Sequence, residues 1–120
     1  MTETQKIEVN LLPLSTNNAY IRPRKTAEYR QYEKDLPWLL PKITLPPAPY
    51  RVRFIFYINK GGDWDNCIKQ TQDIIAKHYG FNDKDIYEGL VTKVPTPKKK
   101  DRRFVFQILH YDESNPEHHW

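Results

Sequence analysis

Apolar and polar residues alternate along several short segments of the chain, which is the pattern of half-buried β-strands. The alternation is regular in KIEVNLL (residues 6–12) and in RVRFIFYIN (residues 51–59), where arginines alternate with apolar residues. Residues 86–94 and 102–111 predict two further strands. The segment PTPKKKD joins these last two strands, and because it is short we expect them to pair as an antiparallel hairpin.

Two segments instead carry apolar residues at helical spacing. The first follows Thr26, a suitable N-cap, and Pro37 limits its continuation. The second lies between Gly62 and Gly80, and Gly80 is well placed as its C-terminal stop. We expect His78 to pack on the apolar side of this second helix. That side gathers Cys67, Ile68, Thr71, Ile74, Ile75, His78 and Tyr79.

The order of these elements is β-α-β-α-β-β. It predicts an α+β fold in one domain at residues 1–112, with a small mixed four-stranded sheet and two helices that cover mainly one face. The other face of the sheet could then form the interface of a homodimer. Residues 113–120 are expected to be a flexible C-terminal tail, and we assign His118 and His119 to this tail rather than to a metal site.

The composition agrees with one small soluble domain, because 120 residues suffice for one modest core. The net charge of +4 and the pI of about 9.1 permit a polyanionic partner without demanding one. A single cysteine, Cys67, excludes an internal disulfide framework and favours a reducing, cytoplasmic setting, and we expect it in the core. No apolar stretch approaches the roughly 20 residues of a membrane span, and the first ten residues lack the pattern of a signal peptide.

Two acids, Asp63 and Asp65, stand where the strand at 51–59 gives way to the second helix. Such a position exposes side chains while a rigid framework fixes their direction. One interpretation is structural, because Asp and Asn are favoured N-caps and complement the positive end of the helix dipole. However, two carboxylates beside Asn66 exceed what a cap needs. Their charge suits Mg²⁺, which prefers a few carboxylates together with waters and phosphate oxygens.

Lys69 follows Asp65 by four residues, which places both on the polar face of the helix. They could form an ordinary ion pair worth about 0.3–0.5 kcal/mol. Alternatively, Lys69 could stand beside a metal and stabilise the negative charge that grows on a phosphate in the transition state.

A second acidic group, Asp83 and Asp85, precedes the strand at 86–94. Either acid could meet Asp63 and Asp65 at one edge of the sheet, or both could simply form a turn. A calcium loop is excluded, because an EF-hand beginning at Asp63 needs Asp or Asn, Gly and Glu at its fifth, sixth and twelfth positions. Those positions hold Cys67, Ile68 and Ile74.

Residues 63–95, DWDNCIKQTQDIIAKHYGFNDKDIYEGLVTKVP, resemble the core of the RusA-like Holliday junction resolvases, small endodeoxyribonucleases common in phages and prophages. Those proteins carry a D-x-D-N-x-x-K helix start and then an acid just before a strand that ends near K-x-P. Counting back from Pro95 aligns Asp83, rather than Asp85, with the third catalytic aspartate of the family. The N-terminal LPLSTNNAY also resembles the entry of that family after its first strand, so the match takes in residues 12–20 and 63–95.

The resemblance implies a homodimeric enzyme that cleaves four-way DNA junctions by two symmetric nicks, in DNA recombination and repair, and that requires Mg²⁺ or Mn²⁺. Carried over by position, Asp63, Asp65 and Asp83 would be catalytic and bind the metal. Lys69 would be the essential cation beside them. Asn66 would support the metal ligands or cap the helix.

Three features depart from the pattern of that family, and one is that the segment from the helix to Asp83 is spaced slightly differently. A basic residue often precedes its first motif aspartate, whereas this chain has Gly62 there, with Lys60 nearby. Trp64 is bulkier than the aliphatic residue expected between the two aspartates. These differences bear on sequence preference and DNA contacts more than on the metal site.

DNA needs a basic surface around such an acidic site, because the acids repel phosphates until a metal arrives. Two segments could supply it. The segment RPRK contributes Arg22, Arg24 and Lys25, and KKKDRR contributes Lys98, Lys99, Lys100, Arg102 and Arg103.

Two other functions are compatible with the sequence. The first is a non-catalytic DNA-binding phage protein whose acids merely cap a helix, in which Asp63→Asn would leave DNA function intact. The second is a small metal-dependent phosphotransfer enzyme, active on small phosphate esters or sugar nucleotides and without preference for branched DNA.

Overall fold

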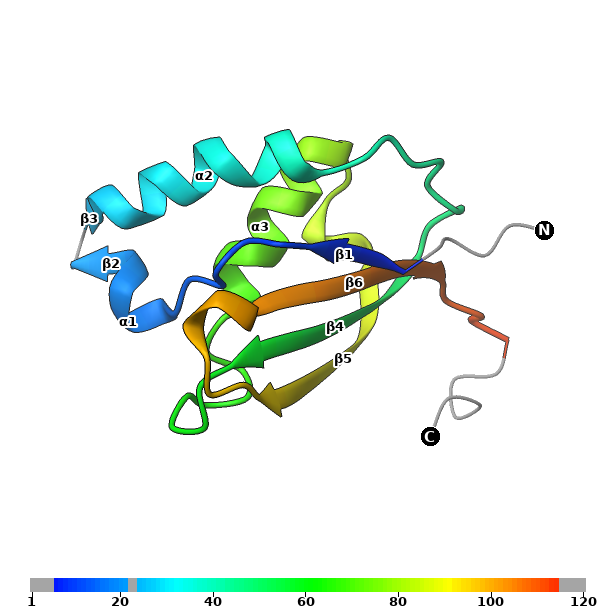
Figure 1. Cartoon of the computed structure of the whole chain (residues 1–120). Coiled ribbons are helices and arrows are strands. Elements are labelled where there is room, and N and C mark those ends of the chain that lie inside the picture. Colours follow the sequence, from blue (N-terminus) through cyan, green and yellow to red (C-terminus); the bar gives the residue numbers. More distant parts are fainter. Residues whose placement is uncertain (1–5, 22–23, 115–120) are drawn as a thin grey trace.

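The computed structural model describes residues 6–21 and 24–114, and it consists of a mixed sheet with two main helices against it (Figure 1). The main sheet has four strands in the order β1-β6-β4-β5. The predicted α+β class with two main helices is confirmed. The elements are β1 (Ile7–Val9), α1 (Thr16–Ala19), β2 (Tyr20–Ile21), β3 (Arg24–Lys25), α2 (Ala27–Leu39), β4 (Tyr50–Ile58), α3 (Ile68–Tyr79), the 3₁₀ turn η1 (Asp83–Asp85), β5 (Ile86–Pro95), the 3₁₀ turn η2 (Lys99–Asp101) and β6 (Arg103–His110).

Strand β4 is the centre of the core, because every second residue from Tyr50 to Ile58 is buried. Phe54 and Phe56 point to the helix side and meet the rings of Phe104 and Phe106 from β6. The centroids of the Phe56 and Phe104 rings are 5.8 Å apart, a distance typical of attractive aromatic pairs. This dense packing holds β4 rigidly, and therefore also fixes the point at which the chain leaves it.

The last two strands do not form the predicted hairpin. β4 lies between them, pairing with β5 in parallel and with β6 in antiparallel orientation. Helix α3 joins the two parallel strands as a β-α-β crossover, the connection that parallel pairing requires. Residues 96–102 then cross the end of β4 to reach β6. Neighbouring strands lie about 4.8 Å apart, so this link is long enough to pass one strand. The short sequence separation of β5 and β6 therefore did not make them neighbours in the sheet.

Both predicted helix signals are confirmed. The Thr26 hydroxyl accepts a hydrogen bond of 3.1 Å from the backbone N–H of Tyr29 at the start of α2. Gly80 ends α3 in the left-handed conformation, with φ of 78°, and its N–H donates to the carbonyl of Ala76 at 2.8 Å. That conformation favours glycine strongly over residues with a Cβ.

The buried surface of α3 differs from the predicted one. Cys67 is buried as expected, whereas His78 is exposed, so the prediction that it packs is wrong. Gln70 and Ala76 are buried in addition. The reason is that α3 packs against α2 as well as against the sheet, which shifts and widens its buried face beyond a single apolar stripe.

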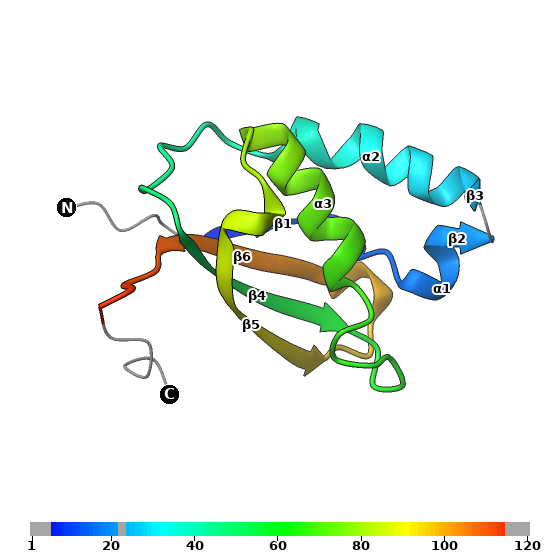
Figure 2. The same ribbon diagram turned by 180° about the vertical axis from the view of Figure 1, so that it is seen from behind.

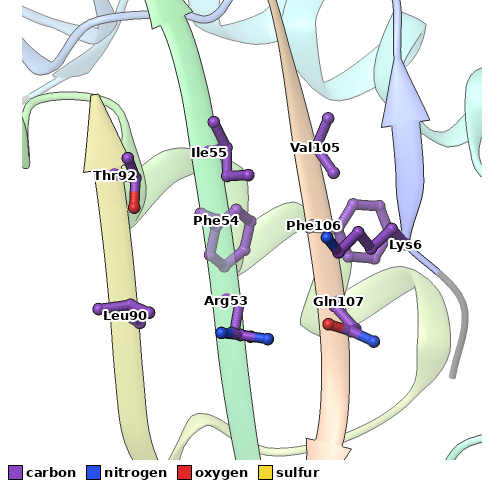
Figure 3. A pocket seen from close by; sticks show the side chains of 9 residues that line it. All are labelled: Lys6, Arg53, Phe54, Ile55, Leu90, Thr92, Val105, Phe106 and Gln107. Atoms are coloured by element: carbon purple, nitrogen blue, oxygen red, sulfur yellow. The ribbon is translucent and has the colours of Figure 1, made fainter. Parts of the chain in front are cut away.

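Both main helices lie on one face of the sheet, as a comparison of the two views shows (Figure 2). On the open face, a shallow hollow of about 110 Å³ lies among side chains that include Arg53, Ile55 and Val105 (Figure 3). No helix in the described ranges has both the length and the apolar character needed to cross a bilayer.

Candidate functional site

The loop at residues 59–67 carries Asp63 and Asp65 from the end of β4 to the start of α3. Both aspartates are exposed. Two backbone hydrogen bonds shape the loop: Gly62 N–H donates to the Asn59 carbonyl at 3.2 Å, and Asn66 N–H donates to the Asp63 carbonyl at 3.1 Å. The acids therefore occupy an ordered turn at the exit of a rigid strand.

The helix-cap interpretation of these acids is wrong. Cys67 occupies the N-cap position of α3, and its side chain makes no capping hydrogen bond. Asp65 contributes only its backbone carbonyl, which lies 3.5 Å from the N–H of Ile68. Within residues 6–21 and 24–114, no hydrogen bond or ion pair involves the carboxylate of Asp63 or Asp65. Both carboxylates are thus open to other ligands.

A groove of about 660 Å³ runs beside this loop, and we call it the Asp63 groove. Its walls come from the loop at 59–67, from the segment between β1 and α1, and from α2. Side-chain amides are prominent in its lining, beside three carboxylates and one guanidinium. The amide residues are Asn18, Gln31, Asn59 and Asn66, and the charged residues are Glu28, Asp35, Asp63 and Arg102.

Gln70 holds two walls of this groove together. Its side chain is fully buried, and its Nε2 amide donates to the carbonyl of Asn66 at 3.0 Å and to the carbonyl of Leu14. Buried polar groups cost free energy unless they are hydrogen-bonded, so this amide stabilises the loop in a defined position. The sequence signal for it was weak: a polar residue beside the apolar stripe of a helix normally faces solvent.

Lys69 pairs with Asp73 one turn further along α3, with 3.2 Å between Nζ and the carboxylate. Within the described part of the chain, no ion pair joins Lys69 to Asp65, the partner that its spacing also allowed. Lys69 and Asp73 line a second groove between α2 and α3, together with Lys25, Lys77 and His78. The Lys69 side chain is 67% exposed, and exposed pairs of this kind are worth less than about 1 kcal/mol. This ion pair therefore contributes little to stability.

Asp83 lies far from the other two acids, and the expectation that they meet at one edge of the sheet is wrong within one chain. β4 and β5 run parallel, with Tyr50 opposite Ile86 and Ile58 opposite Pro95. The segment with Asp83 enters β5 at one end of the sheet, while the loop with Asp63 leaves β4 at the other, as the course of β4, α3 and β5 shows (Figure 2). At about 3.3 Å per residue the strand alone separates these ends by about 26 Å. α3 brings the chain back across the sheet, which sequence order did not reveal.

Asp83 and Asp85 also form a turn, as the structural alternative predicted. Both belong to η1, and the Asn82 side chain accepts a hydrogen bond of 2.9 Å from the N–H of Lys84 at its start. Among the described residues, no three His, Cys, Asp or Glu side chains lie together in a way that could hold a metal ion. One chain therefore offers two acids at the β4 exit and a third at the opposite end.

The predicted DNA-binding cations fall into three groups. Arg22 lies outside the described residues. Arg24 is exposed on β3, and Lys25 on the same strand is paired with Glu33 at 2.8 Å. The exposed lysines of the second segment belong to η2 and its N-cap, at the same end of the sheet as the loop at 59–67 (Figure 1). These are Lys98, Lys99 and Lys100.

The two arginines after these lysines have structural contacts. Arg102 donates to the carbonyls of Thr96 at 2.9 Å and Pro97 at 3.0 Å, which fixes the link between β5 and β6. Arg103 pairs with Glu8 of β1, and its guanidinium carbon lies 3.9 Å from the centroid of the Tyr57 ring. These hydrogen bonds and the ring contact hold both guanidinium groups in place. The exposed lysines are therefore the part of this basic segment that is more accessible to a phosphate.

Cys67 lines the Asp63 groove but is a poor nucleophile. Burial raises the pKa of its thiol to about 11. The reactive species of cysteine is the thiolate, which this environment disfavours near neutral pH. Cys67 is therefore not a candidate nucleophile of the groove.

Neither a scan against protein-family models nor a search of curated proteins finds a match to this chain. The resemblance to the RusA-like resolvases accordingly depends on the motif residues themselves, above all on Asp63, Asp65 and Lys69.

Proposed function

We propose that this protein is a Mg²⁺-dependent endodeoxyribonuclease that resolves four-way DNA junctions by paired symmetric nicks, in the cytoplasm of a bacterial host. The observation that carries the proposal is that the carboxylates of Asp63 and Asp65 are exposed and do not cap a helix. Both residues lie at the rigid exit of β4. Asp63 lines the groove and Asp65 lies two residues away in the same turn, so the two exposed carboxylates suit a site for a ligand.

The residues at this exit fit Mg²⁺, which binds through one or two carboxylates plus waters and substrate phosphates. Asp63 and Asp65 would hold the ion, and Mn²⁺ could replace it. When bound, such an ion supplies an activated water and neutralises phosphate oxygens. Asn66 lies in the same turn, and its carbonyl is fixed by Gln70, so its role would be to keep the turn in place.

Lys69 would act after leaving Asp73. Its side chain starts one turn from Asp65 on an exposed surface, and a phosphate held near the acids offers a stronger partner than the exposed carboxylate does. In that position the ammonium group would stabilise the negative charge that develops on the phosphate. The lysines at 98–100 would hold the neighbouring DNA backbone, because they lie at the same end of the sheet.

In this proposal Asp83 comes from a second copy of the chain. One chain keeps Asp83 at the opposite end of the sheet, so a site with three acids needs a partner. Strand β5 is a long open edge of ten residues, whereas β1 at the other edge has three. An unpaired edge strand readily pairs with another chain.

A two-fold axis beside β5 would make the two copies of β5 antiparallel. That arrangement directs the start of one β5, and with it Asp83 of the partner subunit, toward the Pro95 end of the other. Pro95 pairs with Ile58, from which the loop with Asp63 begins. A homodimer would thus have two equivalent sites, as two symmetric nicks require.

The test is cleavage of a labelled synthetic four-way junction, compared with linear duplex, with and without Mg²⁺. We expect symmetric nicking of the junction alone, and its loss in Asp63→Asn and Asp83→Asn variants that still bind the junction. Absence of cleavage with either Mg²⁺ or Mn²⁺ would contradict the proposal. Activity only on small phosphate esters would favour a phosphotransfer enzyme, and junction binding unchanged by Asp63→Asn without any cleavage would favour a non-catalytic DNA-binding protein.

Mixing the two inactive variants tests the shared site. If Asp83 acts across the dimer, a heterodimer of Asp63→Asn and Asp83→Asn chains contains one intact site and one doubly altered site. Mixed protein should then regain nicking of one strand, while each variant alone stays inactive. If all three acids acted within one chain, both sites of the heterodimer would be damaged, and mixing would restore nothing.

A further inference from the structure

Trp64 separates the two exposed aspartates, and its indole is 58% exposed. The hydrogen bond from Asn66 N–H to the Asp63 carbonyl closes a turn with Trp64 and Asp65 at its two central positions. Turns of this kind lie at the protein surface. The indole is therefore presented at the surface of the loop instead of being folded into the core.

The loop that presents this indole is held firmly. Gly62 N–H binds the Asn59 carbonyl at 3.2 Å, and the buried Gln70 amide binds the Asn66 carbonyl at 3.0 Å. The ammonium group of Lys93 on β5 binds the Lys60 carbonyl. A large apolar ring on an ordered turn loses free energy through its contact with water, which burial against a ligand would recover.

The position of the ring limits what that ligand can be. Neighbouring Cα atoms are 3.8 Å apart, so the indole reaches the space next to any group that Asp63 and Asp65 hold. Under the proposed function that group is the phosphate of a nucleotide, and the nearest flat apolar group of a nucleotide is its base. In a continuous duplex the faces of bases are covered by their neighbours, whereas an unpaired base at a branch point offers a free face.

We propose that Trp64 is a stacking platform for an unpaired nucleobase next to the phosphate that is cut. This inference rests on the proposed nuclease function, and it adds the substrate class: DNA with at least one unstacked base at the branch. Stacking on an aromatic side chain tolerates any base, because every base has a π-face. Trp64 would thus favour branched over linear DNA without reading its sequence.

The matched control is Trp38, which is also a tryptophan and is 88% exposed. It belongs to the last turn of α2, far from the loop at 59–67 (Figure 1). Replacing either ring by leucine keeps an apolar side chain at an exposed position, so both variants should fold, which circular dichroism would verify. Trp64→Phe keeps an aromatic face and serves as the conservative variant.

The experiment titrates each full-length protein with an eight-nucleotide single strand, with the matching blunt duplex and with a four-way junction, in Ca²⁺ to prevent cleavage. Tryptophan emission reports stacking. We expect the single strand and the junction to quench wild type and Trp38→Leu, and the duplex to quench them little. Trp64→Leu should lose that quenching and bind the single strand about 5- to 100-fold more weakly, with substantial recovery in Trp64→Phe.

Equal affinity of Trp64→Leu and wild type for the single strand would overturn the inference. So would equal quenching of wild type and Trp64→Leu by the single strand, because the change in emission would then come from another tryptophan. Cleavage of the junction in Mg²⁺ is measured separately on the same proteins. Cleavage by wild type with unchanged binding by Trp64→Leu rejects the stacking role alone, whereas no cleavage by wild type rejects the proposed nuclease.

Discussion

The hydroxyl oxygens of Tyr32 on α2 and Thr71 on α3 lie 2.8 Å apart in the buried contact between the two helices. Tyr32 is 5% exposed and Thr71 is fully buried. Because one hydroxyl must donate and the other accept, the pair fixes the position of α3 against α2. Tyr32 also lines the Asp63 groove, so this bond helps to set the width of the groove.

Loss of one member of this pair should destabilise the protein. Tyr32→Phe leaves the buried Thr71 hydroxyl without this partner, which costs about 1–2 kcal/mol of unfolding free energy. Thr71→Val should cost a similar amount. The double variant should cost less than the sum of the two, because neither polar group then remains buried alone. Urea denaturation of the four proteins measures the coupling, and strictly additive costs would show that the bond contributes nothing.

Gln70→Leu should loosen the wall of the Asp63 groove. The carbonyls of Leu14 and Asn66 lose their donor, which costs about 2 kcal/mol. Hydrogen exchange at the amides of residues 59–67 should become faster while exchange in β4 changes less. Gln72→Leu, at a half-buried position of the same helix, serves as the control. The same exchange pattern in both variants would argue against the bracing role of Gln70.

Lys69 and Asp73 give a test that separates catalysis from a surface ion pair. Lys69→Ala should lower the rate of junction cleavage by about 100-fold, as removal of a charge-stabilising group does. Its free energy of unfolding should change by less than about 1 kcal/mol. Asp73→Asn breaks the same ion pair but keeps the Lys69 ammonium group, so it should keep the rate. Equal rates in the two variants would mean that Lys69 has no role beyond the pair.

The raised pKa of the Cys67 thiol should make the free energy of unfolding depend on pH. Burial raises the pKa of its thiol to about 11, above the ordinary value of about 8.5 that it regains on unfolding. The stabilisation is therefore complete below about pH 8.5 and is lost as the pH rises toward 11. By pH 9.5 the loss should be about 1–2 kcal/mol. Urea denaturation from pH 7.5 to 9.5 measures it, and Cys67→Ala should show a flatter dependence despite lower stability throughout.

The lysines at 98–100 should control how DNA binding depends on salt. Each lysine that neutralises a phosphate adds about 0.9 to the slope of log affinity against log salt concentration on duplex DNA. The triple alanine variant should have a shallower slope, whereas Lys42→Ala, an exposed lysine after α2, should not. Titration of a junction in Ca²⁺ at several salt concentrations measures both. An unchanged slope in the triple variant would place DNA elsewhere.

Local patterns predicted the two main helices and the four strands of the main sheet, but they missed α1, β2 and β3, and β1 is shorter than the predicted residues 6–12. The alternation in residues 51–59 and the caps at Thr26 and Gly80 depend on neighbouring residues, and the structure confirms them. Strand pairing depends on the whole sheet. β4 lies between β5 and β6 because of how the apolar faces of the strands pack. The short link between residues 95 and 103 gives no information about that packing.

The candidate site was only partly predictable for the same reason. Asp63 and Asp65 are close in sequence, so their common position at the β4 exit could be predicted. The position of Asp83 depends on the direction of β5, which the sequence does not give. The partner of Lys69 depends on whether Asp65 or Asp73 binds it, and spacing alone does not decide between them. Gln70 makes bonds to a segment far away in sequence, which no local pattern reveals.

The pairing of β1 with β6 has a consequence for the synthesis of the protein. Ile7 lies opposite Phe106, so β1 cannot pair until β6, the last strand described, has been synthesised. A growing chain can form α2 early, but its β1 segment has no partner until β6 has left the ribosome. Contacts so distant in sequence slow folding, and the unpaired segments in the meantime are natural targets for chaperones.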